Sequence, residues 1–350
     1  MSRVKVVSVY GLAALNLLVV GSPGGSVAEE PAPFSYVFAG EWGKPGTRDG
    51  EFRCLEAITI GPDGNVYVVD SGNSRIQYFT RDGSFLGKWG SRGNGPGQFN
   101  NPRAMAAAPN GDIYVTDWVD IERTRIQRFT SNGSYVLEWR FGGDEPEIRY
   151  SWGDYYEDYY DVPTDLAIGP NGHVYVLGDV SRQVHEYTPT GSLICEWGDT
   201  RLWGPEEAVW YEETPGPPGM FWSPDGIALA PNGGVYVADT GFYRVQYFSP
   251  TGSFRGMWGE YGGGPGQFDH PDGIDVGEDG IVFVTDRHNH RVQYFTATGS
   301  LLGLWGSRGA GPGEFEYPAY VAVNTGEVVY VTDDTNDRVQ YFRRTSGEPK

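Results

Sequence analysis

The chain has 350 residues, of which 52 are glycine and 24 are proline, and aromatic residues make up 15%. This composition is typical of many short strands joined by tight turns, and it excludes a fold of long helices. The formal net charge of −20 excludes nucleic acid as an expected partner and disfavours anionic membranes, because both are bound through Lys and Arg, whereas cationic partners and metal ions fit it.

Residues 1–28 differ from the rest and are predicted to be a signal peptide. Arg3 and Lys5 precede the apolar run Val6–Val20, and small residues follow as far as Ala28. The apolar run is short for a membrane span, and no later segment is a candidate, so no span is expected after cleavage. We therefore expect a secreted protein, extracellular or periplasmic, with residues 29–350 as its mature domain.

One sequence pattern recurs from residue 36 to the end of the chain. It contains an apolar strand, a Gly turn, a strand ending in Asp, a strand beginning with Arg, and a final strand ending in Trp. The final Trp residues are 47 to 61 positions apart: Trp42, Trp89, Trp139, Trp197, Trp258 and Trp305. A period of this length with four strand-like pieces is typical of a β-propeller blade.

The first complete repeat predicts strands over residues 57–60, 65–69, 75–80 and 85–89, joined by turns that contain Gly. The last repeat ends after Phe342 without its Trp strand, whereas residues 36–43 supply such a strand at the other end. We therefore predict an all-β fold, a six-bladed β-propeller of four-stranded antiparallel blades whose sixth blade is closed by the N-terminal strand. Cys54 and Cys195 then fall in different blades, and no disulfide is expected.

The Asp that ends the second strand and the Arg that opens the third strand recur along the chain, as in Asp70 and Arg75. Because copies of one pair in every blade cannot all be one active site, we predict structural ion pairs. The third repeat has Gly178 and Gln183 instead, so it lacks both partners. The recurrent Gln77 and its counterparts are expected to form hydrogen bonds between strands.

Two connections between repeats, residues 140–162 and 199–223, are longer than the others, and the loop after Asp117 is extended. Antiparallel topology places all three on one rim of the ring. These loops are rich in acidic residues and in Trp and Tyr. Aromatic residues at a surface suit recognition of an extracellular protein, peptide or glycan. The candidate ligand-binding residues here are Trp118, Trp152, Tyr155, Tyr156, Trp203, Trp210, Tyr211 and Trp222. These rings could instead only hold the loops against the propeller.

The residue that opens each inner strand is predicted to line the channel mouth on this same rim: Glu56, Arg103, Thr164, Asp225, Asp272 and Ala319. Arg103 is a candidate for binding a polar ligand. Glu56, Asp165, Asp225 and Asp272 are candidate ligands for a metal ion such as Ca²⁺. The Pro-Asp-Gly sequences at 224–226 and 271–273 also fit plain turn chemistry.

The repeats resemble the NHL family at Asn73-Ser74-Arg75-Ile76, Asn289-His290-Arg291-Val292 and Asn336-Asp337-Arg338-Val339. The resemblance implies a propeller, and it covers binding modules, zinc lyases with channel histidines, and, among related six-bladed propellers, lactonases that hold Ca²⁺ with carboxylates. None of the five His here opens an inner strand, so a three-His zinc site is not expected. We favour a binding or scaffold module, with a Ca²⁺-dependent lactonase or lyase-like hydrolase at the channel mouth as the alternative.

Overall fold

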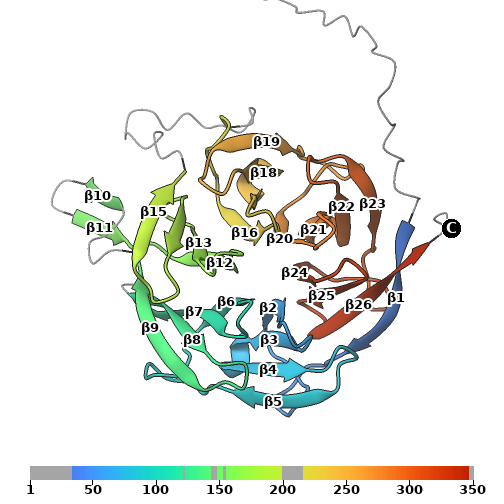
Figure 1. The fold of residues 1–350 in the computed structure, drawn as a ribbon, viewed down its shortest axis with the longest axis horizontal. Coiled ribbons are helices and arrows are strands. Elements are labelled where there is room, and N and C mark those ends of the chain that lie inside the picture. Colours follow the sequence, from blue (N-terminus) through green and yellow to red (C-terminus); the bar gives the residue numbers. More distant parts are fainter. Residues whose placement is uncertain (1–33, 121–122, 143–147, 153–154, 199–215, 347–350) are drawn as a thin grey trace, which may run out of the picture.

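The chain forms a closed ring of six four-stranded antiparallel sheets. In each sheet the four strands follow one another from the central axis to the outer wall (Figure 1). The computed structural model describes residues 34–120, 123–142, 148–152, 155–198 and 216–346, so the predicted signal peptide lies outside the described residues. Within these ranges, no helix has the length and apolarity needed to cross a membrane. The predicted all-β six-bladed propeller is confirmed.

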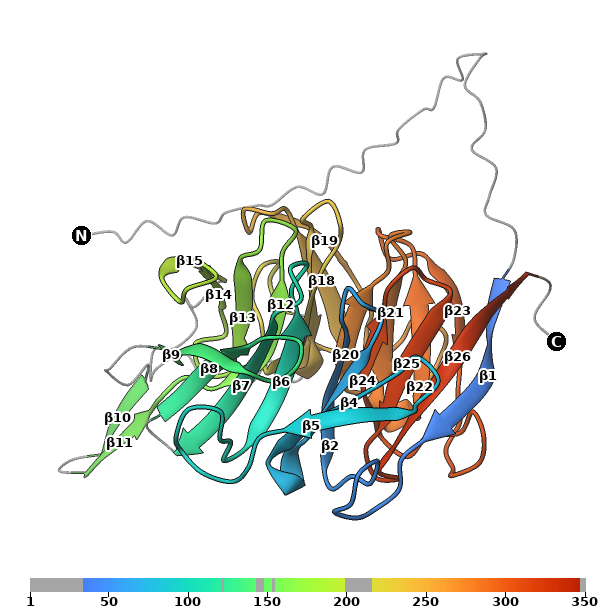
Figure 2. The same ribbon diagram turned by 60° about the horizontal axis from the view of Figure 1, so that its bottom comes forward.

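The first three blades contain, in chain order, β2 (Leu55–Ile60), β3 (Val66–Asp70), β4 (Arg75–Phe79) and β5 (Phe85–Trp89); β6 (Pro102–Ala107), β7 (Ile113–Asp120), β8 (Arg123–Phe129) and β9 (Tyr135–Phe141); and β12 (Pro163–Ile168), β13 (Val174–Gly178), β14 (Val184–Tyr187) and β15 (Leu193–Trp197). A separate hairpin, β10 (Ile148–Trp152) and β11 (Tyr155–Tyr159), projects from the edge of the ring (Figures 1 and 2).

The other three blades contain β16 (Pro224–Leu229), β17 (Val235–Asp239), β18 (Arg244–Phe248) and β19 (Phe254–Trp258); β20 (Pro271–Val276), β21 (Val282–Asp286), β22 (Arg291–Phe295) and β23 (Leu301–Trp305); and β24 (Pro318–Val323), β25 (Val328–Asp333), β26 (Arg338–Ser346) and β1 (Phe34–Trp42). Short 3₁₀ helices follow the second strand of three blades: η1 (Ser71–Asn73), η2 (Thr240–Phe242) and η3 (Arg287–Asn289).

The sixth blade is closed by the N-terminal strand, as the sequence predicts. β1 pairs with β26 along its length, from Phe34 opposite Ser346 to Trp42 opposite Val339. The O–H of Tyr36 also donates a hydrogen bond of 2.6 Å to the carbonyl of Gly326. Strand pairing between the two ends of the chain therefore closes the ring and leaves the sixth blade with four strands.

Inner strands lie very close together around the axis, which explains their small residues. A Cβ atom at Gly226 would come within 2.3 Å of the carbonyl oxygen of Asp272 in the next blade. At Gly273 it would come within 2.5 Å of the carbonyl oxygen of Ala319. Only glycine fits at such a close approach of two backbones. Cys54 and Cys195 lie in different blades and are both free.

The repeated Asp and Arg form buried ion pairs, confirming their predicted structural role. The N–O distance is 2.6 to 2.9 Å in the five blades that keep both residues, and each Asp is fully buried. Arg75 also donates to the carbonyls of Thr47, Arg48 and Glu51, which belong to the connection from the previous blade. Each pair therefore fastens the inter-blade connection to the middle strands.

Blade three replaces this pair in a way that the sequence did not predict. Asp161, from the long connection before β12, places its carboxylate where an Asp side chain at 178 would lie, since a Cβ on Gly178 would be 2.2 Å from it. Asp161 accepts hydrogen bonds from the N–H groups of Val180 and Ser181, and its other oxygen lies 3.2 Å from Nε2 of His185. A carboxylate is therefore present in this blade, supplied by the connection.

Candidate functional site

The residues that open the inner strands are aimed at the axis by β-bulges. The pairing of β20 with β21 shifts register between Pro271 and Ile274, which leaves Asp272 in the irregular segment. The same shift occurs at the start of the other inner strands, including those that carry Glu56 and Asp225. Bulges turn side chains away from the regular alternation of a strand. At the rim, these side chains therefore do not follow the regular alternation of the two faces of a strand.

These side chains line a pocket of about 270 Å³ at one mouth of the channel. The pocket also takes residues from the loops that follow the second strands. Its lining consists of Glu56, Arg103, Thr164, Asp225, Thr240, His270, Asp272, Arg287, His288, Tyr320 and Asp334. Three of the four candidate metal ligands, Glu56, Asp225 and Asp272, are therefore brought together with Arg103.

Asp165 does not join this group. Its two carboxylate oxygens accept hydrogen bonds from the backbone N–H groups of Leu166 and, in the next blade, Ile227, at 2.8 and 2.9 Å. Ala319 is also absent from the lining, because the bulge of the sixth blade presents Tyr320 instead. The carboxylate of Asp165 therefore links blade three to blade four and is separate from the pocket.

Charges in the pocket are only partly paired. Arg287 bridges Asp272 and Asp334 at 2.8 and 2.7 Å. Within the described ranges, the side chains of Glu56 and Arg103 form no hydrogen bond or close ion pair, although the charge of each acts on the other. Arg103 is therefore a guanidinium group held in the pocket and free to bind an anionic or carbonyl oxygen.

Burial changes the acidity of the carboxyl groups here. It raises the pKa of Glu56 to about 7, although the charge of Arg103 opposes the shift. Burial likewise raises the pKa of Asp225 to about 7, assisted by the negative charge of Asp272. Carboxyl groups with pKa values near 7 can both take up and release a proton at neutral pH.

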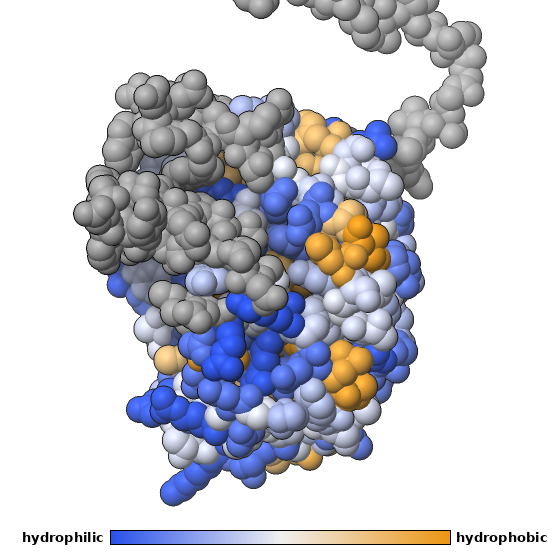
Figure 3. All heavy atoms as spheres, turned by 90° about the vertical axis from the view of Figure 1, so that its left-hand side faces the viewer, coloured by the Kyte–Doolittle hydropathy of each residue, from blue (hydrophilic) through white to orange (hydrophobic). Residues whose placement is uncertain are grey.

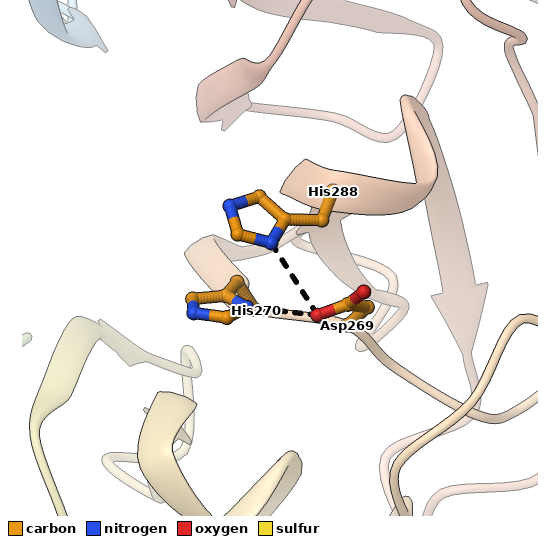
Figure 4. Close-up of side chains that lie close together, drawn as sticks. All are labelled: Asp269, His270 and His288. Carbon is orange, nitrogen blue, oxygen red and sulfur yellow. Dashed lines mark hydrogen bonds and ion pairs between the residues drawn. The ribbon is translucent and has the colours of Figure 1, made fainter.

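Two histidines and an aspartate form a cluster at the edge of this pocket (Figure 4). Oδ1 of Asp269 lies 2.8 Å from Nδ1 of His270 and 3.4 Å from Nδ1 of His288. The centroids of the two imidazole rings are 3.8 Å apart. Burial, followed by the neighbouring His270, lowers the pKa of His288, which favours a neutral ring.

The side chain of Tyr320 crosses the channel below the pocket. Its O–H lies 3.4 Å from the carbonyl of Thr164, on the opposite side of the ring, and the residue is almost fully buried. A second pocket of about 420 Å³ at the other mouth is lined mainly by Gly-Pro turns and apolar residues, such as Pro62, Pro170 and Ala230. The two pockets share no lining residue.

The aromatic candidates of the long loops are only partly described. Trp118, near the end of β7, is 40% exposed, and Trp222, just before β16, is 39% exposed. Trp152, Tyr155 and Tyr156 lie at the turn end of the β10–β11 hairpin, where Trp152 pairs with Tyr155. Three further candidates lie outside the described residues: Trp203, Trp210 and Tyr211. Neither Trp118 nor Trp222, the two candidates whose side chains are described, lines the pocket.

Figure 3 shows the described part of the outer wall on the side that carries β9 and β15. The surface visible there is largely hydrophilic, and its apolar residues form small separate patches (Figure 3). Exposed residues on these outer strands include Val136 and Ile194. Small scattered apolar patches are ordinary on a soluble domain.

Several pocket residues are not predicted from the sequence: Thr240, His270, Arg287, His288, Tyr320 and Asp334. A signal for them does exist. Aligning the repeats shows His270 and His288 at positions that hold Cys54 and Gly72 in blade one, so a search for unusual residues at equivalent loop positions would have found the pair.

Comparison with known proteins supports the repeat assignment. The NHL repeat family matches residues 52–79, 221–248 and 268–295. Each match runs from the inter-blade connection through the first three strands of one blade. These segments contain the Asp–Arg pairs described above.

Three solved structures show the same architecture at low identity. A gluconolactonase from Xanthomonas campestris is 14% identical, with a TM-score of 0.57 over 91% of this chain and 99% of its own. A virginiamycin B lyase from Staphylococcus aureus is 13% identical, with a TM-score of 0.54 over 89% and 98%. A PQQ-bound aldose sugar dehydrogenase from Streptomyces coelicolor is 14% identical, with a TM-score of 0.56 over 90% and 99%. Such similarities establish the fold. The chain is a six-bladed β-propeller that contains NHL repeats.

Proposed function

We propose that this protein is a hydrolase or lyase that acts on a small polar substrate at the polar channel mouth. One observation carries the proposal. The inner-strand residues Glu56, Arg103, Asp225 and Asp272 converge on one pocket from four blades, and the Asp–Arg network that holds the fold uses none of them. The similar folds of a gluconolactonase and a virginiamycin B lyase support this class of activity.

The pocket fits a hard divalent cation such as Ca²⁺. Four carboxyl groups and two guanidinium groups line it, so full ionisation leaves an excess of two negative charges. Burial has already raised the pKa values of Glu56 and Asp225, which shows that ionising them there is costly. Ca²⁺ prefers carboxylate oxygens, and Asp225 and Glu56 are the residues that would hold it. A cation bound there would polarise a carbonyl or ester oxygen.

The chain's own groups supply the remaining chemistry. The Arg103 side chain forms no hydrogen bond or close ion pair within the described residues, although the charges of Glu56 and Asp225 act on it, and it can hold a carboxylate or a developing oxyanion of the substrate. In the pocket without a bound cation, Asp225, with its pKa near 7, can remove a proton from water or from a carbon next to a carbonyl. The first choice gives hydrolysis and the second gives elimination, and the pocket volume limits either to a small molecule.

The experiment is a substrate screen with small lactones, esters and β-substituted carbonyl compounds, with and without added Ca²⁺. Asp225→Asn and Arg103→Ala should each lower turnover at least about 100-fold, which is the usual contribution of an acid–base group or an oxyanion donor. Asp49→Asn, an exposed carboxylate paired with Lys88 outside the pocket, is the matched control and should behave as wild type. Equal activity in all three variants would place the reaction elsewhere.

A second candidate function is recognition of an extracellular protein, peptide or glycan on the same rim. It is favoured by the exposure of two tryptophans, Trp118 and Trp222, at 40% and 39%. The guanidinium of Arg182 lies over the ring of Trp222, 4.4 Å from its centroid, which is a cation–π contact. If this rim binds a partner, Trp118→Ala and Trp222→Ala should each weaken binding at least about tenfold in a peptide and glycan screen, since aromatic contacts dominate interfaces. An exposed aromatic on an outer strand, Tyr135, provides the control variant Tyr135→Ala.

A further inference from the structure

The cluster at the edge of the pocket has the composition of a transition-metal site. We propose that Asp269, His270 and His288 bind a zinc-class divalent ion and leave a coordination position open toward the polar pocket. One carboxylate oxygen and one nitrogen from each imidazole lie within 4.8 Å of one another. The proposal does not rest on the proposed function, because it uses none of the channel-mouth carboxylates.

The backbone that carries the cluster is the same in several blades. The N–H of His288 donates to the carbonyl of Asp269 at 3.1 Å, and the N–H of Arg287 donates to the carbonyl of His270 at 3.0 Å. In blade one the matching bonds join Gly72 to Arg53 and Ser71 to Cys54. The repeat thus fixes where these three side chains start, and the loop need not rearrange to bring them together.

What differs in blade five is the side chains. The equivalent positions hold Arg53, Cys54 and Gly72 in blade one; Trp222, Ser223 and Gly241 in blade four; and Glu316, Tyr317 and Thr335 in blade six. None of these sets offers two imidazoles beside a carboxylate. The fold therefore does not require this combination, and it is specific to the blade that also supplies Asp272, Arg287 and His288 to the pocket.

The distances suit a small ion. A tetrahedral zinc ion with bonds of about 2.0–2.2 Å sets its ligand atoms roughly 3.3 Å apart. The observed separations from Oδ1 of Asp269 are 2.8 Å to His270 and 3.4 Å to His288, so small side-chain rotations would admit the ion. His288 and His270 are both partly accessible, with side chains 40% and 43% exposed, which provides an entry path.

Ligand chemistry distinguishes this site from the carboxylates of the pocket. Imidazole nitrogen suits zinc, cobalt, nickel and copper, whereas Ca²⁺ takes oxygen ligands. Three protein ligands with one open position is the arrangement of catalytic rather than structural zinc. Because His270 and His288 both line the pocket, an oxygen of a ligand bound there could occupy the open position.

The test is metal titration of the purified full-length protein after chelator treatment and removal of the chelator. Zn²⁺ is titrated by calorimetry, and Co²⁺ by its visible absorption, which reports nitrogen ligands and low coordination number. We expect one ion per chain. His288→Ala and His270→Ala should each weaken Zn²⁺ binding more than about 100-fold, above the usual cost of losing an outer partner of a ligand.

Two control variants make the result specific. His173→Ala removes a histidine paired with Glu186 at the opposite rim, and it should bind Zn²⁺ as wild type does. Asp225→Asn removes a pocket carboxylate and should also leave Zn²⁺ affinity unchanged, even if it abolishes any response to Ca²⁺. Absence of Zn²⁺ binding by wild type, or equal loss in His173→Ala and His288→Ala, would overturn the proposal and leave Asp269 and His270 as a hydrogen-bonded pair.

Discussion

At the scale of single residues, the buried Asp–Arg pairs carry much of the propeller's geometry. Arg291 donates to Asp286 at 2.7 Å and to the carbonyls of Gly263, Gly264 and Gln267, so one guanidinium satisfies four acceptors. Gln293 adds two further donations, to Asp286 and Gln267. A buried network of this kind is stable only when every member is present.

Arg291→Ala should therefore lower the free energy of unfolding by about 1–3 kcal/mol, because a buried carboxylate and three carbonyls each lose one hydrogen-bond donor. Denaturant unfolding measures the change. The control is Arg308→Ala, which removes a 70% exposed guanidinium paired with Glu316 and should cost less than about 1 kcal/mol. Equal destabilisation by both variants would contradict the network, and so would a change in ligand binding without loss of stability.

The repeat was sufficient to predict these pairs, because Asp and Arg recur at fixed offsets and one function cannot need every copy. It could not predict Asp161. Its carboxylate reaches Gly178 only through the path of the connection before β12, and nothing in the local sequence marks that path. The proximity of His270 and His288 could not be predicted for a related reason. They are 18 positions apart, and a pair of backbone hydrogen bonds brings them together.

At the scale of elements, β1 decides whether the ring is closed. It contributes the outer strand of blade six, and its Trp42 packs on Gly83 of blade one, where a Cβ would come within 2.6 Å of the indole. The same contact joins Trp89 to Gly133 and Trp258 to Gly299. β1 therefore supplies both a strand pairing and one of the contacts between neighbouring blades.

Deletion of residues 1–42 should lower the melting temperature by roughly 10 °C or more, because it exposes β26 as an edge and removes an inter-blade contact. Differential scanning calorimetry measures the effect. Deletion of residues 1–28 alone, which ends before β1, is the control and should leave the melting temperature unchanged. A small effect of the longer deletion would mean that the ring does not depend on this closure.

The six blades and their closure follow from the sequence because period, turn glycines and the missing final strand all give the same count. The positions of the long connections on one rim follow from antiparallel topology. Their conformations do not, because only residues 148–152 alternate apolar and polar side chains, and residues 155–159 carry no alternation that distinguishes a hairpin from a loop.

At the scale of the whole molecule, the two ends of the channel differ in chemistry. One mouth gathers charged groups from several blades, and the other is lined by turns with small and apolar residues. The charged mouth makes the stability of the protein depend on pH. Glu56 has a pKa of about 7 in the folded protein and an ordinary value of 4.5.

Between pH 4.5 and about 7 the folded state therefore holds more protons at Glu56 than the unfolded state does. Stability must then fall as pH rises through this window, and Glu56→Gln should remove that loss. We expect the unfolding free energy of the variant, relative to wild type, to increase from pH 4.5 to 7 and to be constant above it, as measured by urea unfolding at each pH.

Glu51→Gln is the control, because the carboxyl group of Glu51 should contribute a pH dependence of stability opposite in sign to that of Glu56. Backbone hydrogen bonds from Arg48 and Thr47 lower the pKa of Glu51, so its contribution is present above pH 4.5 and is lost below it. If the unfolding free energies of Glu56→Gln and wild type differed by a constant amount over the whole pH range, the carboxyl group of Glu56 would have an ordinary pKa in the folded protein.

The phenol of Tyr320, lying across the axis between two pockets with no residue in common, has a kinetic consequence. If this side chain closes the channel, a compound that enters the charged mouth must leave through the same mouth. Turnover would then follow a strict order in which departing product vacates the entrance before the next substrate arrives. Product should accordingly inhibit competitively, and a bulky molecule lodged at that rim should slow release as much as entry.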